Sequence, residues 1–356
     1  MRLTAFRAVV LGLVIGSLLV PGGELQAFAQ AQQQEPKKPE PPQKPDQNKE
    51  YAITVDVPVV NVDVVATDNN GNPIGGLRKE NFRILEDGVP QTITNFGATD
   101  APITIVILME FSKLGYEYFA YKATTWAPEF LNNLKGDDWV ALVTYDMKTR
   151  IEVDFTKDKQ EVRQAITHLY FPGFSEANLF DAVNETVDRL QDVKGKKAIL
   201  LLASGFDTFS KHTLDQTIKR LRQTDVTIFT VGVGRELIEY YDARGALSGM
   251  ARVGYYQAEN QLNSFARMTG GRGWSPRFDG ELPGIFREVA ESLRNQYSIG
   301  YVPTNKARDG KFRKIKVELV APDGSPLVIT DQKGKKVKYV VYAREGYIVP
   351  KVGVGD

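Results

Sequence analysis

Cysteine is absent from the 356 residues of this chain, and histidine occurs only at His168 and His212. Without cysteine the protein has no disulfides, no thiolate nucleophile and no zinc site built on Cys ligands. Two histidines are also a poor basis for His-rich metal sites or for Ser-His-Asp triads. Most catalytic repertoires are therefore disfavoured, and we expect both histidines at the surface or at helix ends.

The sequence also lacks a strong net charge and a long apolar run. Lys and Arg number 45 and Asp and Glu number 44, so the formal net charge is +1. Such a balance creates no field that would attract nucleic acid or an anionic membrane. The apolar run near the N-terminus covers only residues 8–20, whereas a membrane-spanning helix needs about 20 apolar residues.

The N-terminus has the pattern of a secretory signal peptide. Arg2 and Arg7 precede the apolar run, and Ala27-Phe28-Ala29 is a small-x-small cleavage site. We expect a signal peptide at 1–29, cleaved after Ala29, and a secreted or periplasmic protein with no membrane span after cleavage; an uncleaved anchor is the alternative. The absence of cysteine favours bacterial export over eukaryotic secretion. Residues 30–50, rich in Pro and Gln, are expected to form a disordered linker.

Two segments with β patterning bracket the middle of the chain. In 51–97, Val60, Val62 and Val64 alternate with polar residues, and Glu86-Asp87-Gly88 predicts a hairpin turn. In 297–349, strand patterns alternate with turn signals such as Asp309-Gly310, and a short tail follows at 350–356. Each segment is too thin to fold alone, so we expect the two to join as one small β-sandwich.

Between the brackets, at 98–296, buried strands alternate with helical patterns. Continuous apolar runs at 103–109, 139–143, 198–203 and 226–231 indicate strands buried on both faces. Apolar stripes predict helices between these runs, and we expect Pro128 to kink or split the first helix. Further helices are expected at 260–268 and 281–295. The predicted fold class is α/β, a doubly wound, mostly parallel sheet inserted between the two β segments.

The order and spacing of several motifs resemble the von Willebrand factor type A (VWA) domain. These motifs are Ile105-Val106-Ile107-Leu108-Met109-Glu110-Phe111-Ser112, Asn178-Leu179-Phe180-Asp181-Ala182 and Lys197-Ala198-Ile199-Leu200-Leu201-Leu202-Ala203-Ser204-Gly205. More narrowly, the chain is similar to secreted VWA-related proteins abundant in Acidobacteria. That resemblance rests on Gly76-Leu77 through Glu86-Asp87-Gly88, on Thr269-Gly270-Gly271-Arg272 and on Gln296-Tyr297-Ser298-Ile299-Gly300-Tyr301-Val302-Pro303.

The resemblance implies a divalent cation site in three loops at the carboxyl ends of the strands, but the ligand positions are altered. Where the family has Asp-x-Ser-x-Ser, this chain has Glu110, Ser112 and Leu114. Ala177 stands in the place of the threonine of the second loop, unless the loop is shifted by two residues and Ser175 serves. Ser204 replaces the acid of the third loop. We therefore expect a degenerate, metal-free site at Glu110, Ser112 and Asp207, with retained magnesium as the alternative.

Without a metal, we expect the strand-end crevice to bind a partner directly. Lys113, Tyr116, Ser175 and Ser204 are the candidate contact residues, and tyrosines near the strand ends either provide exposed contact area or pack a long loop. The leading interpretation is an exported, non-enzymatic module that binds a protein or a cell-envelope component. A magnesium-dependent adhesion module is the second interpretation. A hydrolase of envelope polymers is the third, although no pair of carboxylates stands out by its spacing.

Overall fold

The structure is a computed structural model that describes residues 59–97, 101–330 and 334–351. The predicted signal peptide, the linker and residues 51–58 of the first β segment lie outside the described residues. Within the described ranges, no helix has both the length and the apolar character needed to span a membrane.

A six-stranded sheet forms the centre of the fold, in the order β10-β9-β8-β5-β6-β7. All neighbouring strands are parallel except β7, which pairs with β6 in the antiparallel sense and was not predicted from the sequence. The apolar runs of β5 and β8 are buried along nearly their whole length, as expected for strands covered on both faces. The strands are β5 (Ile103–Glu110), β6 (Trp139–Tyr145), β7 (Thr149–Thr156), β8 (Lys196–Ala203), β9 (Thr227–Gly232) and β10 (Gly273–Trp274).

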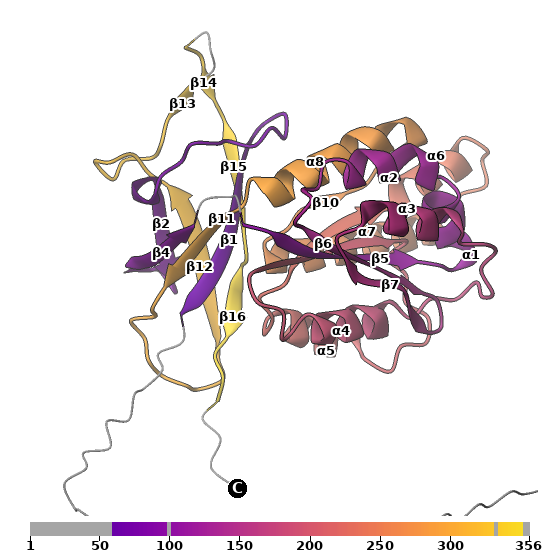
Figure 1. Cartoon of the computed structure of the whole chain (residues 1–356), viewed down its shortest axis with the longest axis horizontal. Helices are drawn as coiled ribbons and strands as arrows, with labels where there is room; N and C mark the ends of the chain where they lie inside the picture. Colours follow the sequence, from indigo (N-terminus) through magenta and orange to yellow (C-terminus); the bar gives the residue numbers. More distant parts are fainter. Residues whose placement is uncertain (1–58, 98–100, 331–333, 352–356) are drawn as a thin grey trace, which may run out of the picture. The chain divides into compact units, whose positions relative to one another are not determined.

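Helices cover both faces of this sheet (Figure 1). One core cluster joins the sheet to α2, α3 and α8, and a second joins its other face to α4, α5 and α7. The predicted doubly wound α/β architecture is thus confirmed. The helical elements are α1 (Lys113–Gly115), the π-helix η2 (Tyr116–Ala120), α2 (Ala123–Leu131), α3 (Lys159–Thr167), α4 (Leu179–Arg189), α5 (Leu214–Leu221), α6 (Gly234–Asp242), α7 (Gly249–Thr269), the 3₁₀ turn η3 (Asp279–Glu281) and α8 (Leu282–Arg294).

Two helical predictions were wrong in detail. The break in the first helix falls between η2 and α2, before Pro128, which lies inside α2. The helix expected at 260–268 begins earlier, at Gly249, because Ser248 caps its first turn by accepting a hydrogen bond from the Ala251 N–H. The helix ends where predicted, at Gly270, whose φ of 89° is a left-handed conformation that glycine adopts without strain.

The two β segments pack together as a sandwich of two four-stranded antiparallel sheets. Their orders are β15-β1-β11-β4 and β16-β12-β2-β3, so each sheet takes strands from both segments. Val62, Ile84, Ile299 and Ile315 belong to one core cluster between the sheets. The elements are β1 (Val60–Asp68), the turn η1 (Lys79–Asn81), β2 (Phe82–Glu86), β3 (Val89–Gln91), β4 (Ile93–Gly97), β11 (Tyr297–Tyr301), β12 (Phe312–Leu319), β13 (Ile329–Thr330), β14 (Lys336–Val337), β15 (Tyr339–Ala343) and β16 (Gly346–Ile348).

Candidate strand-end binding site

Glu110, the last residue of β5, links the loop after β5 to the loop after β8 through its side chain, and we call this arrangement at the predicted crevice the closed crevice. The carboxyl accepts a hydrogen bond from the Ser112 hydroxyl at 2.6 Å and another from the Ser204 backbone N–H at 2.6 Å. Both oxygens therefore have partners inside the chain, and Glu110 is only 2% exposed. Burial raises the pKa of Glu110, although the hydrogen bonds from Ser112 and Ser204 act in the opposite direction.

Tyr145 faces the same carboxyl from the end of β6, where it is the register partner of Glu110. Its buried hydroxyl makes no hydrogen bond of normal geometry with the described residues. Burial, and then the negative charge of Glu110, raise the pKa of that hydroxyl. Tyr145 was not predicted as a site residue, although its place at the end of a buried strand was a usable signal.

Backbone hydrogen bonds hold the strand-end loops against one another. The N–H of Phe111 donates to the Tyr145 carbonyl at 2.6 Å, and the N–H of Lys113 donates to the Phe174 carbonyl at 3.0 Å. The N–H of Thr208 donates to the Ala177 carbonyl at 2.9 Å. Loops tied in this way present a preformed surface, because little ordering remains to be done when a partner binds.

Asp207 does not join Glu110 and Ser112. Its carboxylate accepts hydrogen bonds from the Phe180 backbone N–H at 3.0 Å and from the Ser210 hydroxyl at 2.5 Å. Asp207 thus serves the first turn of α4, whose free N–H groups favour an acceptor. Asp181 is likewise occupied elsewhere, since it accepts from the N–H groups of Lys211 and His212 ahead of α5.

The structure separates the predicted partner-contact residues into two groups. Lys113 and Ser175 are exposed and Tyr116 is half-buried, so their side chains are available at the surface. Ser204 is 2% exposed, and its hydroxyl accepts a hydrogen bond from the Phe206 N–H. The side chain of Ser204 is therefore not available at the surface, and its contact with a partner stays a prediction.

The residues present do not fit a divalent cation. The carboxyl of Glu110 accepts hydrogen bonds from Ser112 and Ser204, and the carboxylate of Asp207 accepts one from the first turn of α4. Throughout the described ranges, no three His, Cys, Asp or Glu side chains converge as metal ligands do. Magnesium asks for about six oxygen ligands in a near-octahedral shell, whereas this crevice offers one buried carboxyl and two serines.

An exposed aromatic patch adjoins the closed crevice. We define it by Tyr116, Tyr121, Phe171 and Phe174. The Tyr116 ring lies 6.5 Å from the ring of Tyr121 and 6.2 Å from that of Phe171, centroid to centroid. Tyr121 is 72% exposed, Phe171 83% and Phe174 48%. Tyr116 was predicted as a contact residue but the phenylalanines were not, although the run Leu169-Tyr170-Phe171-Pro172-Gly173-Phe174 indicates an aromatic loop.

The parallel strands, the flanking helices and the position of Glu110 after β5 agree with one known domain. Residues 104–258 match the von Willebrand factor type A domain. The match covers the strands β5 to β9 and the strand-end loops, so Glu110, Ser112 and Ser204 lie within the matched residues. The narrower resemblance to secreted VWA-related proteins of Acidobacteria stays a prediction.

Two solved structures with some similarity to this chain contain VWA domains. A von Willebrand factor type A protein from Catenulispora acidiphila is 12% identical, with a TM-score of 0.43, covering 79% of this chain and 73% of that one. The VWA domain of the type V pili tip protein Mfa5 from Porphyromonas gingivalis is 13% identical, with a TM-score of 0.39 and coverages of 54% and 95%.

Proximal thread matrix protein 1 from the mussel byssus, solved with a zinc-occupied metal site, is 11% identical with a TM-score of 0.42. The alignment covers 54% of this chain and 48% of the byssus protein, so the chain spans about half the length of that protein. No curated protein matches the sequence.

Proposed function

We propose that this chain is an exported, non-enzymatic binding module that holds a protein or cell-envelope component at the strand-end face of its VWA domain without a metal ion. The observation that supports this most directly is the Glu110 carboxyl, which is buried and bonded to Ser112 and Ser204 at the place where the resemblance implies a cation. Because this carboxyl is occupied, we expect the partner to be bound by direct contact with surface side chains and not through a metal ion.

The aromatic patch supplies that contact surface. Aromatic side chains contribute large, rigid, amphipathic area and are enriched at binding hot spots. Lys113 lies beside the patch, because its backbone N–H donates a hydrogen bond to the Phe174 carbonyl. Its side chain adds one positive charge to this surface. A surface of this composition suits a protein partner with apolar side chains and an acidic group facing Lys113.

Capture of partners from an envelope extract tests the proposed surface. We expect the double substitution Tyr121→Ala and Phe171→Ala to remove most of the recovered partner, and Lys113→Glu to reduce it, without a change in melting temperature. Val328→Ser is the matched control, because Val328 is also an exposed apolar side chain, at 58%, but lies far along the chain from the patch, directly before β13. Equal recovery by the double variant and this control would contradict the proposal.

A thermal-stability measurement tests the absence of a cation. A ligand present at a hundredfold excess over its dissociation constant stabilises a fold by about 2.7 kcal/mol. We expect the same melting temperature in magnesium, manganese and chelator, both for the unmodified protein and for Glu110→Ala relative to its own baseline. An increase with either ion that disappears in Glu110→Ala would favour a magnesium-dependent module instead.

A further inference from the structure

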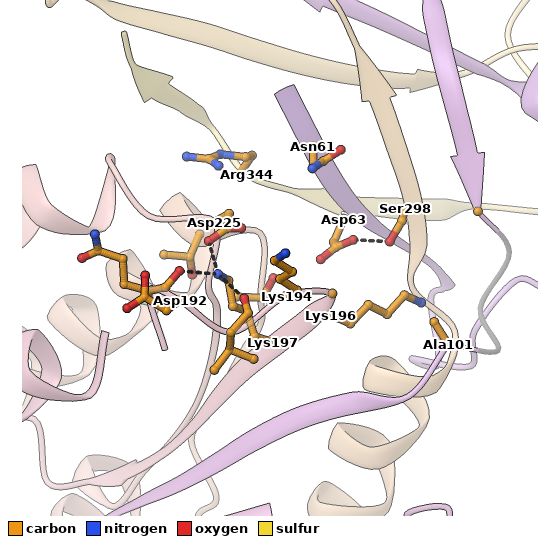
Figure 2. Close-up of a pocket in the computed structure, with 16 residues that line it drawn as sticks. Asn61, Asp63, Ala101, Asp192, Lys194, Lys196, Lys197, Asp225, Ser298 and Arg344 are labelled. Carbon is orange, nitrogen blue, oxygen red and sulfur yellow. Dashed lines mark hydrogen bonds and ion pairs between the residues drawn. The ribbon is translucent and has the colours of Figure 1, made fainter. Parts of the chain in front are cut away.

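A second candidate site lies at the other end of β8 from Ser204. A cavity of about 650 Å³ separates the start of β8 from the outer face of the sheet that contains β1 and β11. Figure 2 shows Asp63, Ser298 and Arg344 on the β-sandwich side, facing the loop of Lys194 and the side chain of Asp225. This volume falls in the range of small-molecule sites, which is about 300–1,000 Å³.

The polar lining follows from the alternation of β1. Val62 and Val64 point into the sandwich core, so Asp63 points to the opposite face, toward the VWA domain. Asp63 pairs in register with Ser298 and accepts a hydrogen bond from its hydroxyl at 2.6 Å. The face of this sheet that lines the cavity is therefore polar.

The cations around the cavity differ in how well they are neutralised. Lys197 forms an ion pair with Asp225 at 2.9 Å and also donates to backbone carbonyls. Arg344, directly after β15, donates through Nε to the Gly346 carbonyl at 3.0 Å and through a terminal nitrogen to the Arg222 carbonyl at 3.4 Å. Among the described residues, no carboxylate forms an ion pair with Arg344.

The charge of Arg344 is only partly compensated, because Asp225 and Asp63 attract it through space but neither forms an ion pair with it. Burial lowers the pKa of Arg344, and burial also raises the pKa of Asp63 across the cavity. A guanidinium carries five N–H donors in a planar fork that matches a carboxylate or a phosphate. The two backbone carbonyls accept from only two of the nitrogen atoms of Arg344, Nε and one terminal nitrogen, and neither carbonyl carries a negative charge.

We propose that this cavity binds a small ligand through a carboxylate group, which pairs with Arg344 and lies near Lys194. A singly charged group fits better than a phosphate dianion, because the lining has a formal excess of one positive charge. Its four cations are Lys194, Lys196, Lys197 and Arg344, and its three carboxylates are those of Asp63, Asp192 and Asp225. The Asp63 and Ser298 side chains then receive hydrogen bonds from polar groups on the remainder of the ligand. The carboxylate belongs either to a free organic acid or to the C-terminus of a peptide.

Calorimetric titration of the purified full chain tests this site with four probes: propionate, trialanine, trialanine amide and inorganic phosphate. We expect binding of propionate or trialanine and none of the amide, which lacks the carboxylate. Stronger binding of propionate indicates a free acid, and stronger binding of trialanine indicates a peptide C-terminus. Preferential binding of phosphate, or equal binding of trialanine and its amide, would overturn the proposal.

The same titration on variants tests whether the probe binds in this cavity. Loss of a charged hydrogen-bond partner weakens binding by about tenfold to a hundredfold, and we expect this for Arg344→Gln, with partial recovery in Arg344→Lys. Arg235→Gln is the matched control, since Arg235 pairs with Glu259 away from the cavity. If Arg344→Gln does not fold, Lys194→Glu on the exposed rim replaces it, with an expected loss of about threefold to tenfold. If folded Arg344→Gln or Lys194→Glu binds the carboxylate probe as tightly as the unmodified protein, the probe binds elsewhere and the proposed site is refuted.

Discussion

The Glu110 carboxyl accepts a hydrogen bond from the Ser204 backbone N–H at 2.6 Å, between the carboxyl ends of two neighbouring strands, β5 and β8. Glutamate is one methylene longer than the aspartate that the family resemblance implies at this position. The added length is consistent with the reach of the carboxyl to the opposite loop. The side chains that the resemblance implies as metal ligands are thus joined here by internal hydrogen bonds.

This burial predicts a pH-dependent effect of Glu110→Gln. A carboxyl whose pKa is raised in the folded state stabilises the fold fully below its unfolded pKa, near 4.5, and that contribution is lost as the pH rises through the folded value. The amide keeps the size and an acceptor for Ser204 but never ionises. We expect the variant to gain stability relative to the unmodified protein as the pH rises from 4.5. Denaturant unfolding at pH 4.5, 6 and 8 measures the free energy of unfolding of both proteins. A difference between them that does not change with pH would contradict the prediction.

Gly115 predicts a steric effect at the same site. A Cβ on Gly115 would lie 2.2 Å from the Glu110 backbone carbonyl oxygen, which cannot move aside without disturbing β5. We expect Gly115→Ala to destabilise the fold by about 1–3 kcal/mol, as overpacking does. Gly284→Ala in α8 is the control, since nothing lies within 4 Å of its Cβ position. Because alanine favours helices, that variant should be stabilised by up to about 1 kcal/mol, as measured by urea unfolding.

A cluster beside η2 predicts a second pH dependence. Lys122 bridges Glu236 at 3.2 Å and Asp279 at 2.5 Å. Burial, and then the hydrogen bond with Asp279, raise the pKa of Glu236 to about 7. The stabilising contribution of Glu236 is full below its ordinary pKa of 4.5 and is lost as the pH rises through 7. We expect Glu236→Gln to be about 1 kcal/mol more stable than the unmodified protein at pH 8, and closer to it at pH 5. Thermal melts at both pH values decide this.

The β-sandwich core contains a polar group that joins the two β segments. Glu86 of β2 accepts hydrogen bonds from the Tyr301 hydroxyl at 2.7 Å and the Tyr347 hydroxyl at 3.0 Å. We expect Tyr301→Phe to cost about 1–3 kcal/mol, because it leaves a buried acceptor with fewer partners. Tyr339→Phe is the milder control, since its hydroxyl lies 3.5 Å from the Leu319 carbonyl. Equal urea midpoints for the two variants would argue against this role of Glu86.

Much of the fold was predictable because it depends on patterns between near neighbours in the sequence. The apolar runs of β5 and β8 indicated strands buried on both faces, and the alternation of Val60, Val62 and Val64 indicated β1. The antiparallel strand β7 was missed, since its burial depends on pairing with β6 rather than on its own pattern. The early start of α7 was missed because Ser248 acts as a cap only in the folded geometry.

The candidate site was predictable in its residues but only partly in their roles. The positions of Glu110, Ser112 and Ser204 after their strands brought them correctly to one edge of the sheet. Asp207 follows the same strand as Ser204, yet its side chain turns toward the first turn of α4. Spacing along the chain fixes where a loop begins, whereas the direction of a side chain depends on donors contributed by other loops.

The sequence by itself determined which residue types are available to this protein: no cysteine, two histidines, buried parallel strands and a crevice whose implied acids are altered. Only the tertiary structure decided that Glu110 closes the crevice, that Phe171 extends the patch around Tyr116, and that Arg344 faces a cavity beside Asp63. The reason is physical. Composition and periodicity act over a few neighbouring residues, but the partners of these groups come from segments tens to hundreds of positions away.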